Sequence, residues 1–244
     1  MTKKPDTAFK GFSEDLFKFL KDLEKNNKVE WFHKNKERYQ NKLVLPAKSF
    51  ISEMAPFLNR LNPSIRTEPK FNKTIMRLNK DMRFAKGDPY RAFLLIHFGR
   101  FKMDSEFFLY FQPDDFGTGI FINKNSGDNL YFSQNLKKYP NEIKEVFKQY
   151  GINNNYSLYD LENEDDIIVK KFNADNHFDK LEDIDLVILQ KAKMVPDKIL
   201  YSDAIIIETI KMISKLYPLY CFAISPQPLK LLQRYKDEFG VLVD

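Results

Sequence analysis

Cysteine and glycine are scarce in this sequence of 244 residues. Its single cysteine, Cys221, excludes a framework of disulfides within the chain. Only 8 glycines are present, which argues against glycine-rich phosphate-binding loops, collagen-like repeats and flexible linkers. Aromatic residues, by contrast, make up 15% of the chain, so we expect them to supply much of a buried core.

Long hydrophobic runs are also absent. Apolar stretches such as Phe107–Phe111 and Ala204–Ile207 are far below the ~20 residues that a membrane-spanning helix needs. The first ten residues are polar and contain no apolar core of a secretory signal. Together with the single thiol, these features predict a cytoplasmic protein with no membrane partner.

The sequence contains few of the patterns that metal ions and nucleophilic catalysis require. Its three histidines, His33, His97 and His177, are widely separated, and no second cysteine completes a zinc site. Cys221 lies in the apolar run 219–224, where burial keeps a thiol protonated and inert. We therefore expect no metal and no cofactor.

Charge is distributed unevenly along the chain, whose net charge is +5. Residues 1–103 contain 23 basic and 11 acidic side chains, whereas residues 104–244 contain 16 and 23. A basic half attracts nucleic acid, anionic metabolites or acidic partners through its long-range field. The same asymmetry also fits two halves that pair electrostatically, or a basic face that is simply solvated.

The hydrophobic pattern predicts one α+β domain over residues 1–244, with an antiparallel meander in the middle and helices before and after it. Its expected parts are a disordered start over 1–12, helices over 13–62, antiparallel strands over 73–123, and mixed helix and strand over 133–244.

Capping residues and breaks divide these regions into elements. We expect a first helix capped by Ser13, a break at Asn26-Asn27, and a second helix from Lys28 to about residue 43. A third helix starts near Pro46 and is kinked or ended early by Pro56. The predicted strands cover residues 74–78, 92–98, 106–111, 119–122 and 166–172, and the later helices cover 140–150, 202–216 and 226–239.

The densest polar stretch lies between two predicted strands, at residues 77–91. Arginine forms paired hydrogen bonds with carboxylates and phosphates, so the cations here predict a cradle for an anionic ligand. Asp81 would orient an arginine, act as an acid or base, or bind a metal. The alternative is a hydrogen-bonded network that pins the hairpin. The candidate ligand-binding residues are Arg77, Arg83, Lys86, Tyr90 and Arg91, and the candidate catalytic residue is Asp81.

This stretch also resembles a known family. The residues that carry the resemblance are Asn26-Asn27, Trp31-Phe32, Tyr39, Pro46, Arg77-x-x-x-Asp81-x-Arg83-Phe84 and Pro89-Tyr90-Arg91. They resemble an uncharacterised family of bacterial and fungal proteins, domain of unknown function 2461, over roughly residues 9–240. The chain has Lys86-Gly87-Asp88 where the family typically has two lysines and one further residue. The resemblance implies a shared fold and a site at the Arg/Asp stretch, and it implies no reaction.

Three classes of function remain open. The first is a protein, with or without catalytic activity, that binds a small anionic ligand carrying phosphate or carboxylate at the 77–91 stretch. The second is a nucleic-acid-binding module, with Trp31 either stacking on a base or packed in a corner between helices. The third is a non-catalytic protein-interaction domain, and the sequence assigns no oligomeric state. The second hypothesis uses the cations Lys25, Lys28, Lys34, Lys36, Arg38 and Lys42.

Overall fold

The structure is a computed structural model that describes residues 8–84, 86–163, 167–192 and 197–240. The chain divides into two compact units, which are described separately. The first unit comprises Met1–Lys102, Phe108–Gly117 and Ala192–Ile210, and the second comprises Met103–Phe107, Thr118–Lys191 and Lys211–Asp244.

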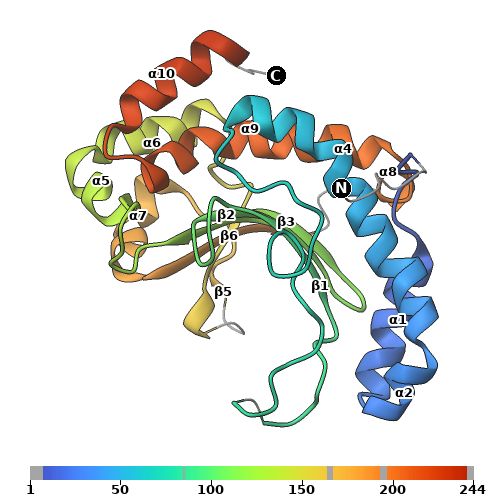
Figure 1. The fold of residues 1–244 in the computed structure, drawn as a ribbon. Helices are drawn as coiled ribbons and strands as arrows, with labels where there is room; N and C mark the ends of the chain where they lie inside the picture. Colours follow the sequence, from blue (N-terminus) through green and yellow to red (C-terminus); the bar gives the residue numbers. More distant parts are fainter. Residues whose placement is uncertain (1–7, 85, 164–166, 193–196, 241–244) are drawn as a thin grey trace. The chain divides into compact units, whose positions relative to one another are not determined.

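The first unit begins with a series of helices (Figure 1). In α1 (Glu14–Lys25) the side chains of Leu16, Phe19, Leu20 and Leu23 are fully buried, as their spacing predicts. The helices that follow are α2 (Val29–Lys34), α3 (Lys36–Tyr39), the π-helical segment η1 (Gln40–Val44) and α4 (Leu45–Leu61).

The structure corrects one expectation for these helices and decides against one alternative of a second, the early end at Pro56. The single helix expected from Lys28 to about residue 43 is interrupted at Asn35, whose side chain donates to the carbonyl of Trp31 at 2.9 Å and so satisfies a terminal acceptor of α2. Pro56 lies inside α4, and the helix continues to Leu61. The hydrogen bond that a proline removes is offset by burial of apolar side chains on both sides of it, including Phe50 and Leu58.

The packed chain begins before Ser13. Residues 8–12 belong to the start that was expected to be disordered, yet Phe9 and Phe12 are buried. The ring of Phe12 lies 5.4 Å from that of Phe50 and 4.6 Å from that of Phe111. These contacts supply the apolar burial that a disordered segment lacks. Residues 1–7 of the expected start lie outside the described residues.

The middle of the chain forms a six-stranded antiparallel sheet, which confirms the α+β class with helices before and after the sheet. Its strand order is β1-β2-β3-β6-β4-β5, and β2 and β3 contribute residues to both units. In the second unit, Leu158 of β4 pairs with Leu189 of β6. The strands are β1 (Leu94–Phe98), β2 (Glu106–Phe111), β3 (Phe116–Asn123), β4 (Ser157–Asp160), β5 (Ile167–Val169) and β6 (Leu186–Ala192).

The strand expected at residues 74–78 does not form. This segment makes only isolated bridges, including Ile75 to Ile96. A tight turn precedes it, in which the backbone N–H groups of Lys73, Thr74 and Ile75 all donate to the carbonyl of Lys70. Because the turn uses these donors locally, they are not available to a regular strand ladder.

Helices of the second unit are tied together by side-chain hydrogen bonds to helix carbonyls. Asn135 donates to the carbonyls of Phe222 and Ser225, at 2.7 and 2.8 Å, near the end of α9. The Tyr235 hydroxyl donates to the carbonyl of Ser214 at 2.9 Å. The second unit contains α5 (Phe132–Lys138), α6 (Pro140–Gln149), η2 (Leu161–Asn163), α7 (Ala174–Asp183) and α10 (Pro228–Phe239). The helix α8 (Asp197–Leu200) belongs to the first unit, and α9 (Ala204–Ile224) begins in the first unit and ends in the second.

The helix expected at 202–216 is longer in the structure, because α9 passes through Pro218 and ends at Ile224. Cys221 lies in this added part and is fully buried, and burial raises the pKa of its thiol, as the sequence predicted for an inert cysteine. No helix in the described part of the chain, α9 included, is both long enough and apolar enough to cross a membrane.

Gly119 gives a test of the packing between β3 and β6. A Cβ at this position would overlap the carbonyl oxygen of Leu189, so the backbone must shift to accept alanine. We expect Gly119→Ala to lower the free energy of unfolding by about 1–3 kcal/mol, as overpacking does. Urea denaturation measures the loss. Gly127→Ala is the matched control, because its Cβ would meet only the side chain of Leu130 at 3.4 Å. Equal stability of the two variants would contradict this reading of the packing.

Candidate functional site

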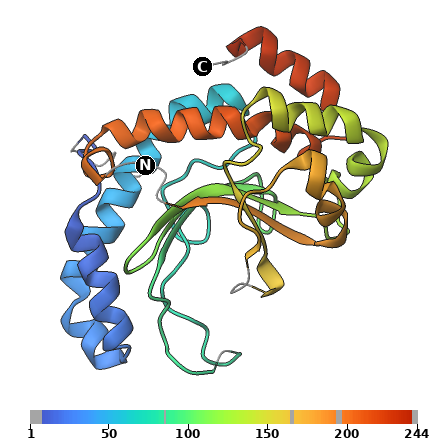
Figure 2. The same cartoon turned by 180° about the vertical axis from the view of Figure 1, so that it is seen from behind.

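The predicted site lies on a long hairpin of the first unit, residues 77–91, called here the 77–91 hairpin. Its base is closed by a bridge between Asn79 and Tyr90 and by two backbone hydrogen bonds. Arg91 N–H donates to the carbonyl of Leu78 at 2.7 Å, and Lys80 N–H donates to the carbonyl of Pro89 at 2.8 Å. Figure 1 and Figure 2 show the hairpin, in blue-green, extending away from β1.

The side chain of Asn27 joins the base of this hairpin to the corner between α1 and α2. Its Nδ2 donates to the carbonyl of Tyr90 at 2.9 Å, and the Tyr90 N–H donates to its Oδ1 at 3.0 Å. The ring of Phe32 stacks on the ring of Tyr90, with 4.2 Å between centroids and 13° between planes. Three residues of the family motif therefore form one junction, although 63 positions separate Asn27 from Tyr90.

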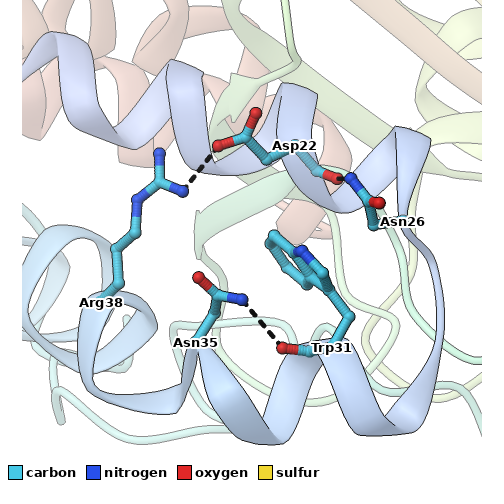
Figure 3. A network of polar contacts seen from close by, with 5 residues as sticks. All are labelled: Asp22, Asn26, Trp31, Asn35 and Arg38. Atoms are coloured by element: carbon cyan, nitrogen blue, oxygen red, sulfur yellow. Dashed lines mark hydrogen bonds and ion pairs between the residues drawn. The ribbon is translucent and has the colours of Figure 1, made fainter.

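Trp31 is part of the packing beneath this junction. Its half-buried ring lies 5.7 Å from the ring of Phe19, and Figure 3 shows it pointing from α2 toward α1. Beside it, Arg38 Nη1 donates to Asp22 Oδ2 at 2.6 Å, and the Arg38 guanidinium lies 5.5 Å from the centre of the Phe19 ring. Asn26 donates to the carbonyl of Asp22 at 2.9 Å. The corner packing is thus the arrangement present, and Trp31 is no free stacking platform.

Asp81 and Arg83 form a paired ion bridge on the exposed part of the hairpin. Arg83 Nε donates to Asp81 Oδ1 at 2.9 Å, and Nη2 donates to Oδ2 at 2.7 Å. These bonds lower the pKa of the Asp81 carboxyl and raise the pKa of the Arg83 guanidinium. A carboxylate held in this way is a weaker base than a free one, so the geometry favours Asp81 as a residue that orients Arg83.

Arg91 and Tyr90 belong to the base of the hairpin. Nη1 of Arg91 donates to the backbone carbonyls of Arg77 and Asn79, at 3.4 and 3.2 Å. Tyr90 is buried, and burial raises the pKa of its phenol. Both residues are therefore used to build the hairpin.

Arg77 and Lys86 are exposed cations on the same hairpin. Arg77 lies near enough to Tyr39 for its charge to lower the pKa of that phenol, against a larger rise from burial. In the described part of the chain, no side-chain hydrogen bond or ion pair joins Arg77, Lys86 or Arg91 to Asp81. The six candidates therefore divide between the base and the exposed arm, and their functional roles stay predictions.

Sequence reasoning missed Phe84. Its side chain is 86% exposed, and the Arg83 guanidinium lies 5.5 Å from its ring centre. Met82, two residues before it, is 46% exposed. The signal that was present is two large apolar residues within an otherwise polar turn, where neither contributes to a core.

Two of the six cations proposed to bind nucleic acid on the N-terminal helices are paired with acidic side chains. Besides the pair of Arg38 with Asp22, Lys42 lies 3.0 Å from Asp15 in an ion pair. Lys25, Lys28, Lys34 and Lys36 remain exposed. Across the described residues, no group of three or more His, Cys, Asp or Glu side chains is placed to hold a metal ion.

Comparison with known proteins identifies the class to which this fold and hairpin belong. A family model described as "Conserved hypothetical protein (DUF2461)" matches residues 15–222. The chain belongs to this family, as the resemblance implied. No curated protein and no solved structure matches the chain.

The Asn27 junction is tested by comparing two neighbouring asparagines. Asn27→Ala leaves the N–H and the carbonyl of Tyr90 without their partner in a half-buried position, so we expect the free energy of unfolding to fall by about 1–3 kcal/mol. Asn26→Ala removes one exposed hydrogen bond within its own helix end, and we expect a smaller loss. Urea denaturation of both variants measures the two losses. Equal losses would show that the hydrogen bonds of the junction stabilise the fold no more than the exposed bond of Asn26 does.

Tyr39 predicts a pH dependence. Burial raises the pKa of its phenol to about 12 from an ordinary value of 10. The buried neutral phenol therefore contributes fully to the stability of the folded state below pH 10. This contribution is lost as the pH rises from 10 to 12, and the free energy of unfolding falls by roughly 2–3 kcal/mol in total. Tyr39→Phe cannot ionise, so we expect its stability to fall less over this interval than that of the wild type. Parallel curves from urea denaturation at pH 8 to 12 would contradict the prediction.

Proposed function

We propose that this protein binds an anionic ligand, holding its phosphate or carboxylate groups on the exposed cations of the 77–91 hairpin. The observation that carries the proposal is the state of Arg83. Its side chain is 80% exposed, and Asp81 holds it by two hydrogen bonds in a fixed direction.

A guanidinium has five N–H donors, of which Asp81 uses the Nε hydrogen and one on Nη2. The two hydrogens of Nη1 and the second hydrogen of Nη2 remain for a ligand. Paired donors of this kind match the geometry of phosphate and carboxylate oxygens. Because Asp81 already fixes the arginine, less side-chain entropy is lost when an anion binds.

The charge around Arg83 also favours an anion. The 77–91 hairpin contains five basic and two acidic residues, and one of the acids is the Asp81 that pairs with Arg83. Arg77 and Lys86 are exposed, so their field extends into solvent. Binding rather than turnover is the activity that this arrangement supports, since the candidate acid or base is engaged by Arg83.

The proposed compartment is the cytoplasm. The only cysteine is buried and carries a protonated thiol, which suits a reducing environment. The alternative of a nucleic-acid site on the N-terminal helices has less support, because two of its six cations are already paired with acids.

Removal of the Arg83 charge tests the proposal. We expect isothermal titration to detect binding of tripolyphosphate or citrate to the wild type, and Arg83→Gln to weaken it about tenfold, since hydrogen bonds to charged groups contribute about 1.5–3 kcal/mol. Arg83→Lys keeps the charge but loses the paired donors, so its affinity should fall between the two.

Lys230→Gln is the matched control, because Lys230 is an exposed cation on α10 in the other unit. Its affinity for both anions should equal that of the wild type. The variants at residue 83 should unfold at the wild-type urea concentration, because both partners of the ion pair are exposed. Unchanged affinity of Arg83→Gln, or the same loss in Lys230→Gln, would overturn the proposal.

A further inference from the structure

Phe84 is the most exposed large apolar side chain among the described residues. It is 86% exposed, and Ile207, the next most exposed large apolar residue described, is 55% exposed. Its only ring contact in the described part of the chain is the Arg83 guanidinium, 5.5 Å from the ring centre. A planar apolar ring is therefore presented to solvent beside the arginine proposed to bind anions.

The Phe84 ring does not stabilise the fold through burial. The ring adds almost nothing to a core, because burial is what makes an aromatic side chain stabilising. Single exposed apolar residues are common on protein surfaces and need no explanation alone. Here the ring shares an exposed hairpin with Arg83, Lys86 and Arg77, and that combination has a specific chemistry.

We propose that the anionic ligand is single-stranded nucleic acid, with a base stacked on Phe84 and the neighbouring phosphates held by Arg83 and Lys86. This inference rests on the proposed anion-binding function and names its ligand. Proteins that bind single strands combine cations that follow the phosphates with aromatic rings on which bases stack. Phe84 supplies the face for the base, and the cations on both sides of it in the sequence supply the charge.

The chemistry of the hairpin favours a single strand over a duplex. In a duplex the bases are stacked on one another, so a ring at the end of an exposed hairpin has no base face to cover. The phosphates of a duplex would still attract Arg83 and Lys86. A preference for single strands therefore isolates the contribution of Phe84 from that of the charges.

The hairpin has too little apolar surface for a membrane. Phe84 and Met82 are its exposed large apolar side chains in the described residues. A single myristoyl chain, which buries more apolar surface than these two side chains, gives only marginal membrane binding. An acidic protein with a pocket for Phe84 could also bind these cations. Polyglutamate serves as the probe for that alternative partner.

Fluorescence anisotropy with a labelled single-stranded oligonucleotide, a thymidine 20-mer, tests the inference in low salt. We expect the wild type to bind it at least several-fold more tightly than a duplex of equal length. Phe84→Ala should weaken binding of the single strand about tenfold, because the stacking of one base no longer contributes to the binding free energy. It should leave duplex binding nearly unchanged. Phe84→Leu should behave like Phe84→Ala, because leucine is apolar but has no π face.

Salt dependence separates the two kinds of contact. Arg83→Gln should reduce the slope of log affinity against log salt by about 0.7, the value for one phosphate contact on a single strand, whereas Phe84→Ala should leave the slope unchanged. Ile207→Ala is the matched control for loss of an exposed apolar side chain, and it should bind like the wild type.

The outcomes distinguish this inference from the function on which it rests. Equal affinity of Phe84→Ala and wild type for the single strand overturns the inference. The inference is also overturned if the oligonucleotide does not bind, whereas polyglutamate or phosphatidylserine vesicles bind in a way that depends on Phe84. If tripolyphosphate still binds in an Arg83-dependent way in those cases, the anion-binding function stands. Loss of binding to every anionic probe overturns both.

Discussion

The two hydrogen bonds between the Asn27 side chain and the Tyr90 backbone are the contact on which the hairpin depends. A primary amide presents an N–H and a C=O side by side, as a peptide unit does, so Asn27 occupies the place of a neighbouring strand at the base of the 77–91 hairpin. The ring of Phe32 also stacks on the ring of Tyr90, so an aromatic contact joins the same two segments. With its base held in this way, the hairpin can extend into solvent without a core of its own.

The family motif therefore has two physical roles that its order in the sequence does not separate. Asn27, Phe32 and Tyr90 build the junction by hydrogen bonding and ring stacking. Asp81 and Arg83 lie on the exposed part, where their side chains meet each other and solvent. The first group determines where the hairpin points. The second determines what chemistry it presents.

Patterns with local causes were predictable from the sequence, whereas pairings between distant residues were not. Glu106–Phe111 was predicted with the bounds that β2 has, because a run of large apolar residues is itself the signal. β6 was missed although it lies between β3 and β4 in the sheet, because its short apolar run is followed by Gln190 and Lys191 and its partners are far along the chain. The same limit applies to the site. A cluster of cations is visible in the sequence, but the roles of Tyr90 and Arg91 depend on a register across many residues.

The exposed position of the Asp81–Arg83 pair argues that the pair does not hold the hairpin in place. Both residues lie in the same turn, so their ion pair cannot link the two sides of the hairpin base. Exposed pairs contribute about 0–1 kcal/mol to stability, less than a half-buried paired amide. The closure that a structural network would provide is already supplied by Asn27 and by the bonds from Arg91 to backbone carbonyls. What the ion pair does accomplish is to orient the Arg83 donors, and this orientation is the feature on which the proposed anion binding rests.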